Sequence, residues 1–123
     1  MKFLFVDTYY RGFLDSFYRR QGEALGGLDY SGHLRRLLDE CFGTSDYYSA
    51  NLRSLDCEAL DVVANDLALQ ARWAHEFAPV LLRDRPAAGT PQARAWAHRV
   101  LAAQIGHHRP DVVYIQDIHW ADA

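Results

Sequence analysis

KFLFV, at residues 2–6, is a short apolar and aromatic run that Asp7 and Thr8 follow directly. Its length and composition are typical of a strand buried on both faces of a parallel sheet. Two further runs fit a second and a third strand: ALDVVA at 59–64 and DVVYIQ at 111–116, each with the paired valines that favour strands. The sequence therefore predicts three strands that lie far apart along the chain.

The segments between these strands carry apolar residues at helical spacing. The clearest period lies in 30–42, where one face holds Leu34, Leu37, Leu38, Cys41 and Phe42. Further helices are predicted over 11–21, from candidate caps Thr44 and Ser45 to about residue 55, over 66–78, and from Thr90 to Gly106. RDRPAAG, at 83–89, is the best candidate for a loop.

Strands that alternate with helices favour a parallel sheet, because parallel neighbours need long, right-handed crossovers. We therefore predict an α/β fold, a Rossmann-like three-layer domain with a small parallel sheet flanked by helices. Residues 1–123 are expected to form a single domain. A three-stranded sheet is small for this architecture, and Ala123 follows the third strand closely, so we expect a fragment of a longer chain.

The composition disfavours several classes of partner. The net charge is −3 and the cations are scattered singly or in pairs, which is not the basic stripe of a nucleic-acid-binding or anionic-membrane-binding protein. The apolar run at 3–6 is too short for a signal peptide or a membrane span, so a cytoplasmic location is expected. Cys41 and Cys57 form no CxxC pair and are predicted to be free thiols. The Arg-rich and Ala-rich composition suggests a bacterial source.

Ligands of open α/β sheets bind outside the carboxyl ends of the strands, where the strand order reverses. If the second and third strands flank the first, the residues at that edge are Asp7, Thr8, Tyr9, Tyr10, Asn65, Gln116, Asp117 and His119. Asp7 and Asp117 are suited to hold a hard cation or to orient a substrate hydroxyl. The alternative, which the preference of Asp for such positions favours, is that each caps the turn that follows it.

Tyr9 and Tyr10 are the aromatic candidates for ligand binding at this edge, whereas the helical spacing of Phe13 and Phe17 favours core packing. His119 is a candidate general base. The sequence contains neither GxGxxG nor GxxxxGK[ST], so no dinucleotide or phosphate-binding loop and no cofactor are expected. HExxH is also missing, and the other histidines predict no metal site.

Three segments together resemble the N-terminal domain of bacterial GT-B glycosyltransferases: KFLFVDTYY at 2–10, FGTSDYYSANLRSLDCEALDVVAND at 42–66 and RPDVVYIQD at 109–117. The resemblance implies that this half receives a sugar or glycoconjugate acceptor, while a missing C-terminal domain binds the nucleotide-sugar donor. The matching positions are the loop from Asp7 to Gly12, Asn65, Gln116, Asp117 and His119. The chain departs from many members in carrying DTYYRGFL at 7–14 where they have a glycine-rich loop.

The function predicted from this resemblance is that of an acceptor-side glycosyltransferase domain, inactive alone because the transition state needs groups from both halves. The alternative is a stand-alone receiver-like or small-ligand-binding module with Asp7 and Asp117 in an acidic pocket. Receiver domains have five strands and a lysine after the last, whereas the only lysine here is Lys2. A third possibility is an interaction domain without a ligand. If the sheet is cut short, Val112 to Ile115 form an apolar edge, and a homodimer is expected.

Overall fold

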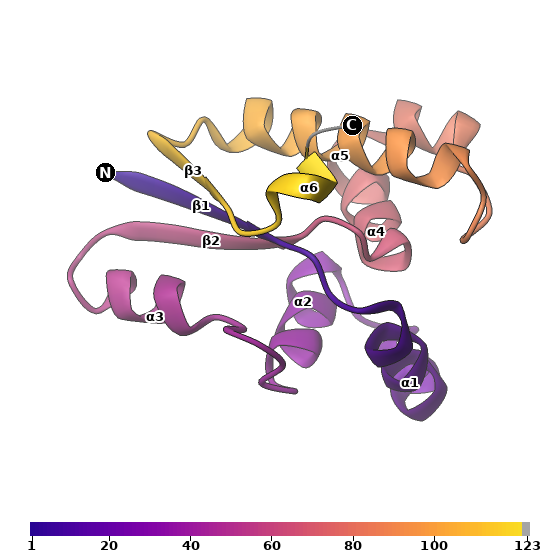
Figure 1. Cartoon of the computed structure of the whole chain (residues 1–123), viewed down its shortest axis with the longest axis horizontal. Helices are drawn as coiled ribbons and strands as arrows, with labels where there is room; N and C mark the ends of the chain where they lie inside the picture. The colour runs from indigo at the N-terminus through magenta and orange to yellow at the C-terminus, as the bar shows by residue number, and fades with distance from the viewer. Residues whose placement is uncertain (122–123) are drawn as a thin grey trace.

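The computed structural model describes residues 1–121 and has an α/β fold, with a small parallel sheet flanked by helices as in Rossmann-like three-layer domains (Figure 1). The strands are β1 (Lys2–Asp7), β2 (Glu58–Val63) and β3 (Val112–Ile115). Both neighbours of β1 pair with it in parallel, in the order β2-β1-β3. The predicted strands are confirmed to within one residue at each end.

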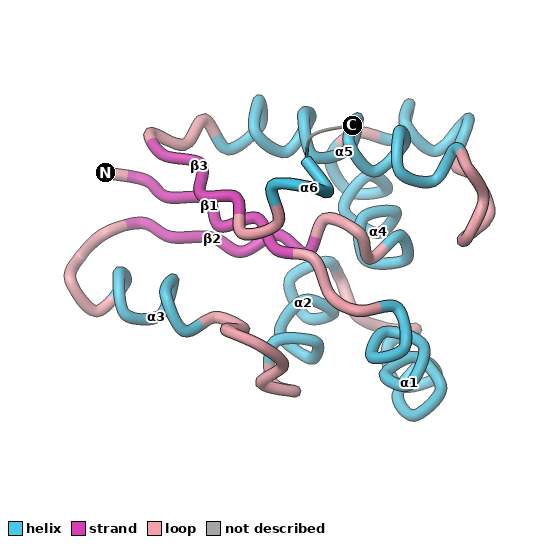
Figure 2. Tube along the Cα trace, viewed as in Figure 1, coloured by secondary structure: helices cyan, strands magenta, loops and turns pink. Residues whose placement is uncertain are grey.

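The helices fill the two crossovers between the strands (Figure 2). Between β1 and β2 the chain forms α1 (Arg11–Gln21), α2 (Tyr30–Leu38) and α3 (Tyr47–Arg53). Between β2 and β3 it forms α4 (Leu67–Phe77) and α5 (Gln92–His108), and α6 (Ile118–Ala121) follows β3. Short 3-10 helices cover Gly22–Leu25 and Pro79–Asp84.

The two crossovers cover opposite faces of the sheet. Leu4 and Val6 of β1 pack with Leu101 of α5 on one face. On the other face Phe5 stacks on Tyr48 of α3, with ring centroids 5.9 Å apart. Figure 1 shows α5 above the sheet and α3 below it. This is the arrangement that right-handed crossovers require when the strand order reverses at β1.

A second and larger apolar cluster lies beyond the sheet, among the helices. It includes Phe17 of α1, Leu37 of α2, Trp73 of α4 and Trp96 of α5, all of them buried. It thereby packs four helices around the loops that follow the strands. Helices therefore surround the carboxyl edge of the sheet, and a cavity lies between them.

The predicted helix over 30–42 is shorter than expected, because α2 ends at Leu38. The Ser45 hydroxyl donates to the Leu38 carbonyl, and Cys41 and Gly43 take positive φ angles of 54° and 57° that turn the chain back. Phe42 nevertheless packs inward, stacked on Phe13 at 4.2 Å. The apolar spacing of the sequence therefore extends beyond the end of α2, because Phe42 lies in a turn but packs into the same core as the helix.

The predicted caps at the start of α3 and at both ends of α5 were also wrong. α3 begins at Tyr47, after Thr44 and Ser45, and α5 begins at Gln92 without a side-chain cap. The Thr90 hydroxyl donates instead to the Ala87 carbonyl within the preceding turn, at 2.8 Å. Gly106 lies inside α5, and Arg109, with φ 50°, makes the left-handed C-cap.

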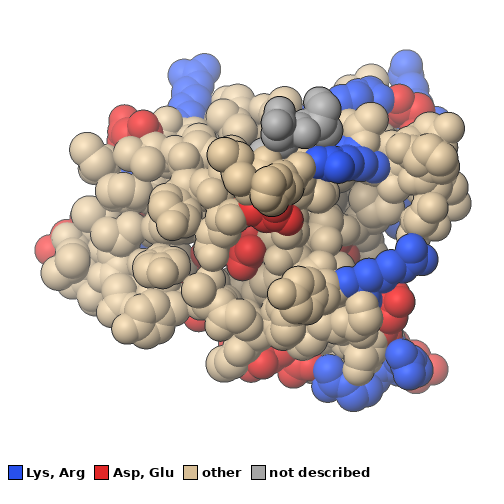
Figure 3. All heavy atoms as spheres, in the orientation of Figure 1, with Lys and Arg blue, Asp and Glu red and all other residues tan. Residues whose placement is uncertain are grey.

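No helix among residues 1–121 is both long enough and apolar enough to cross a bilayer. Cys41 and Cys57 are free thiols, as the sequence predicted. On the face shown in Figure 3, the Lys and Arg side chains are spread around the periphery and do not gather into one patch.

Candidate functional site

The loops that follow the three strands meet at the carboxyl edge of the sheet, as predicted. The Thr8 hydroxyl, after β1, donates to Asp117 Oδ2, after β3, at 2.8 Å. Asn65, after β2, binds the backbone of Tyr9: its Oδ1 accepts from the amide at 3.0 Å, and its Nδ2 donates to the carbonyl at 2.7 Å. The first loop is therefore held between the other two.

The two aspartates at this edge have different surroundings. Asp117 accepts from the Trp120 amide at 3.1 Å and so caps α6, which confirms the capping interpretation for this residue. Hydrogen bonds from the Thr8 hydroxyl and the Trp120 amide lower the pKa of Asp117. Asp7 is half-buried, and desolvation raises its pKa, with the negative charge of Asp117 adding to the effect. The two carboxylates are neighbours, but one is committed to a helix cap.

A cation at this edge would lack ligands in the described part of the chain. Within residues 1–121, no three His, Cys, Asp or Glu side chains are grouped so as to hold a metal ion. A hard cation prefers six or more oxygen ligands, and the Asp117 oxygens already accept from Thr8 and Trp120. The geometry therefore favours the capping role for Asp117.

The two predicted aromatic binding residues point in different directions. Tyr9 is only 3 % exposed, and its ring packs against Phe13 and Phe42 with centroids 5.6 and 5.2 Å away. The prediction that Tyr9 is an aromatic ligand-binding residue at this edge is therefore wrong, because Asn65 fixes the backbone that turns the ring inward. Tyr10 is 78 % exposed and remains open to a ligand.

The other predicted residues are at this edge but serve different contacts. Gln116 accepts a hydrogen bond from the Thr44 hydroxyl at 3.2 Å, which ties the segment before α3 to the end of β3. His119 is exposed, and its carbonyl accepts a hydrogen bond from Arg94. Gly12 is exposed in α1. None of these three lines the cavity described next, whereas Asn65 does.

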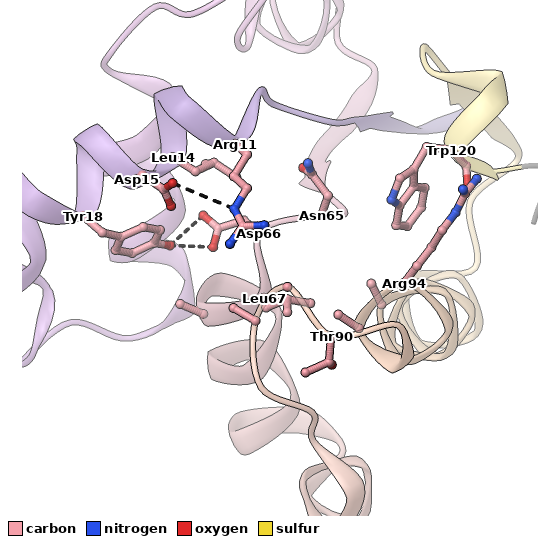
Figure 4. Close-up of a pocket in the computed structure, with 15 residues that line it drawn as sticks. Arg11, Leu14, Asp15, Tyr18, Asn65, Asp66, Leu67, Thr90, Arg94 and Trp120 are labelled. Carbon is pink, nitrogen blue, oxygen red and sulfur yellow. Dashed lines mark hydrogen bonds and ion pairs between the residues drawn. The ribbon is translucent and has the colours of Figure 1, made fainter.

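A cavity of about 380 Å³ lies beside this edge, between α1, the β2–α4 loop, the start of α5 and α6. Its volume is within the range of small-molecule sites. Figure 4 shows Tyr18 and Asp66 at one end, Trp120 and Arg94 at the other, and Asn65 between them. We call this cavity the edge pocket.

The two arginines of the edge pocket differ in what they contact. Arg94 donates to the carbonyls of His119 and Trp120, with its Nη2 2.7 Å from the latter, and so holds α6 against α5. Arg11 is 76 % exposed, and its Nε lies 3.9 Å from Asp15. Its guanidinium also lies against Gly89, where an added Cβ would be 3.1 Å from Nη2. Arg11 is therefore the more available cation.

The inner wall of the edge pocket contains a buried carboxylate. Asp66 is 2 % exposed, and each of its oxygens lies 2.6 Å from the Tyr18 hydroxyl. Its Oδ1 also accepts from the Leu69 amide at 3.2 Å, which caps α4. Burial raises the pKa of Asp66 to about 6, against the lowering effect of these hydrogen bonds. A carboxyl group with this proton affinity can exchange protons near neutral pH.

Of the residues predicted at this edge, Asn65 lines the edge pocket, as does Arg11 of the loop from Asp7 to Gly12. Tyr18, Asp66 and Trp120 also line it and were not among the predicted residues. A partial signal was present, because Asp66 follows Asn65 directly after a buried strand, and Tyr18 puts a hydroxyl on the apolar face of its helix. Comparison of the chain with protein-family models, with curated proteins and with solved structures gives no match. The geometry of the edge pocket is therefore the basis for assigning a function.

Proposed function

We propose that this chain is the acceptor-side N-terminal domain of a nucleotide-sugar-dependent GT-B glycosyltransferase, and that the edge pocket receives a sugar or glycoconjugate acceptor. The observation that carries the proposal is the position of the pocket. It lies outside the carboxyl ends of the parallel strands, because Arg11, Asn65 and Trp120 come from the segments that follow β1, β2 and β3. Open α/β sheets bind their ligands at such points.

The lining of the edge pocket suits a carbohydrate. Trp120 offers a half-buried aromatic ring, and Asp15, Asn65 and Thr90 add polar side chains. Sugar rings have an apolar face that packs on aromatic rings and hydroxyl groups that need directed hydrogen bonds. Apolar contacts from Leu14, Ala93 and Ala97 complete the wall.

The proposed function requires a second domain that binds the nucleotide-sugar donor. Transfer from a nucleotide sugar needs groups that stabilise the leaving diphosphate and hold both substrates together. The chain has no glycine-rich phosphate loop, so we assign the donor site to a C-terminal domain and expect no turnover by residues 1–123 alone. The two free thiols fit a reducing compartment, and we propose the bacterial cytoplasm.

A binding experiment tests the assignment of the pocket. Two-dimensional NMR of the ¹⁵N-labelled chain should show saturable shifts at the Trp120 indole and the Asn65 amide with a panel of mono- and disaccharides. Ala93→Trp should abolish these shifts, because Ala93 lines the pocket. Ala102→Trp is the matched control, since Ala102 is on an exposed face of the same helix.

Other outcomes would contradict the proposal. Robust turnover of a nucleotide sugar by the pure chain would show that no second half is needed. Saturable binding of a non-sugar small molecule at the same residues, with no response to any saccharide, would favour the small-ligand-binding module instead.

A further inference from the structure

Three side chains from three elements form a buried chain behind the edge pocket. Asp66 precedes α4, Tyr18 lies on α1 and His33 lies on α2. The Tyr18 hydroxyl is 2.6 Å from both Asp66 oxygens and 2.9 Å from His33 Nε2. Tyr18 and Asp66 line the pocket (Figure 4), whereas His33 is 1 % exposed.

The hydrogen atoms of this chain can be arranged in two ways that satisfy both contacts. When Asp66 is ionised, Tyr18 donates to the carboxylate and accepts from His33 Nε2–H. When Asp66 is protonated, it donates to the Tyr18 oxygen, and Tyr18 donates to an unprotonated Nε2. His33 is neutral in both arrangements, but its proton is on Nε2 in the first and on Nδ1 in the second.

The other side of the His33 ring leaves this choice open. Nδ1 is buried, and it has no hydrogen-bond partner within residues 1–121. The tautomer of a histidine is normally set by the hydrogen bond that its second ring nitrogen makes. Since Nδ1 makes none here, the contact with Tyr18 alone sets the tautomer, and the tautomer follows the state of Asp66.

We propose that Asp66, Tyr18 and His33 form a proton-accepting site in the wall of the edge pocket, in which Asp66 takes a proton from a hydroxyl group and Tyr18 turns its own hydrogen towards His33. The O–H bond of the donor breaks, its oxygen keeps the electron pair, and a new O–H bond forms on Asp66. The change of tautomer removes one proton from His33 Nε2 and adds one at Nδ1, so the charge of the ring does not change. Because the ring is buried, both protons exchange with water during local opening of the helices. The identity of this hydroxyl as that of a sugar acceptor rests on the proposed function. When no ligand is bound, solvent supplies the proton to Asp66.

Burial and the neighbouring charges make Asp66 the one group of the three that changes its protonation state between about pH 5 and about pH 7.5. Burial, with the charge of Arg72 adding, lowers the pKa of His33 to about 4, so His33 stays neutral. Burial and the nearby Asp66 raise the pKa of Tyr18 well above its usual value. The other titratable or charged groups that face this region are Arg11 and Asp15 of α1, Tyr30 of α2, Arg72 of α4 and Arg94 of α5.

The test is an NMR titration of the whole chain, labelled with ¹³C and ¹⁵N, from about pH 5 to about pH 7.5. We expect the ring ¹⁵N shifts of His33 to change from the Nδ1–H to the Nε2–H tautomer as pH rises, with no sign of imidazolium. The midpoint should equal that of the Asp66 carboxyl ¹³C shift. A single His33 tautomer over the whole range, or an Asp66 carboxyl that titrates near the value of an exposed aspartate, would overturn the proposal.

Variants separate this site from a merely structural contact. In Tyr18→Phe, Asp66 should still titrate while His33 stays in one tautomer, because the connecting hydroxyl is gone. In Asp66→Asn, the His33 tautomer should be independent of pH. Tyr10→Phe is the control, since Tyr10 is exposed and outside the pocket, and it should titrate as the unsubstituted chain does. A tautomer change that persists in Tyr18→Phe would contradict the connection.

A saccharide found in the binding experiment links this site to the proposed function. At saturation it should lower the Asp66 midpoint, because a donated hydroxyl hydrogen bond favours the carboxylate. If no saccharide binds but the tautomer change occurs, the proposed function fails and the proton-accepting site stands. If a saccharide binds at Trp120 without any effect on the Asp66 midpoint, the pocket assignment stands and the hydroxyl contact with Asp66 is wrong.

Discussion

The side-chain amide of Asn65 binds both backbone polar groups of Tyr9, with Nδ2 2.7 Å from the carbonyl and Oδ1 3.0 Å from the amide. This pair of hydrogen bonds extends the pairing of β1 and β2 by a side chain, beyond the last residues of the strands. It places the Tyr9 ring in the core and leaves Tyr10 outside.

Asn65→Ala should destabilise the chain, because both Tyr9 backbone groups lose their partner in a half-buried loop. Leaving such groups unsatisfied costs about 1–3 kcal/mol. Urea unfolding measures the change, and Asn51→Ala, at an exposed position of α3, is the matched control, with an expected effect within about 0.5 kcal/mol. Equal effects of the two substitutions would show that the Asn65 contacts contribute nothing particular.

The buried Gln70–Gln104 pair should show strong coupling. Each amide donates to the other, at 2.8 and 2.9 Å, and both side chains are fully buried between α4 and α5. Gln70→Leu leaves Gln104 without a partner and should cost about 1–3 kcal/mol, whereas the double Leu variant should recover most of this loss. Additive losses in urea unfolding would contradict this.

The pH dependence of stability should contain two opposing contributions. Burial raises the folded-state pKa of Asp61 and Asp66 to about 6 from 3.8, so their contribution is present below about pH 4 and is lost as pH rises through about 6. The folded-state pKa of His33 is lowered to about 4 from 6.5, so its contribution is present above pH 6.5 and is lost as pH falls. The contribution of His33 offsets part of the contribution of the two aspartates within the same pH window.

Single substitutions should reveal each contribution. Asp66→Asn removes one stabilising response to acid, so its stability relative to the parent chain should decrease as pH falls from about 6.5 to about 4. His33→Gln should have the opposite effect and gain stability relative to the parent over the same range. Urea unfolding at several pH values measures the slopes, and identical slopes in all three chains would refute the assignment.

The β3 edge should promote association, as the sequence predicted for a homodimer. Val112, Tyr114 and Ile115 are 36, 50 and 40 % exposed on a strand whose only neighbour is β1 within the described sheet. Unpaired apolar edges recruit other chains, and a charge on the edge opposes this. Light scattering over a concentration series should detect a dimer or larger species, which Tyr114→Lys should reduce and Val80→Lys, on an exposed 3-10 helix, should not. A strict monomer at high concentration would contradict this expectation.

Local sequence pattern was sufficient to predict the strands, most helices and the edge at which the loops meet. KFLFV predicts a buried parallel strand because short, uniformly apolar runs are stable only with both faces covered, whereas DVVYIQ forms an exposed edge strand. The parallel pairing of β3 with β1 then brings Thr8 and Asp117 together, 109 residues apart, as the predicted strand order required. Periodicity failed at Leu38, since a turn that keeps Phe42 in the core produces the same pattern as a helix.

The residues that build the pocket depended on tertiary packing. Local sequence pattern does not distinguish the adjacent residues Tyr9 and Tyr10. Tyr9 is nevertheless buried and Tyr10 exposed, because Asn65, 56 residues from Tyr9 along the chain, binds the Tyr9 backbone and orients it. Tyr18 and Asp66 meet across 48 residues. Such contacts arise only when two crossovers pack on opposite faces of one sheet, because burial and hydrogen-bond partners are properties of the assembled helices and not of any single segment.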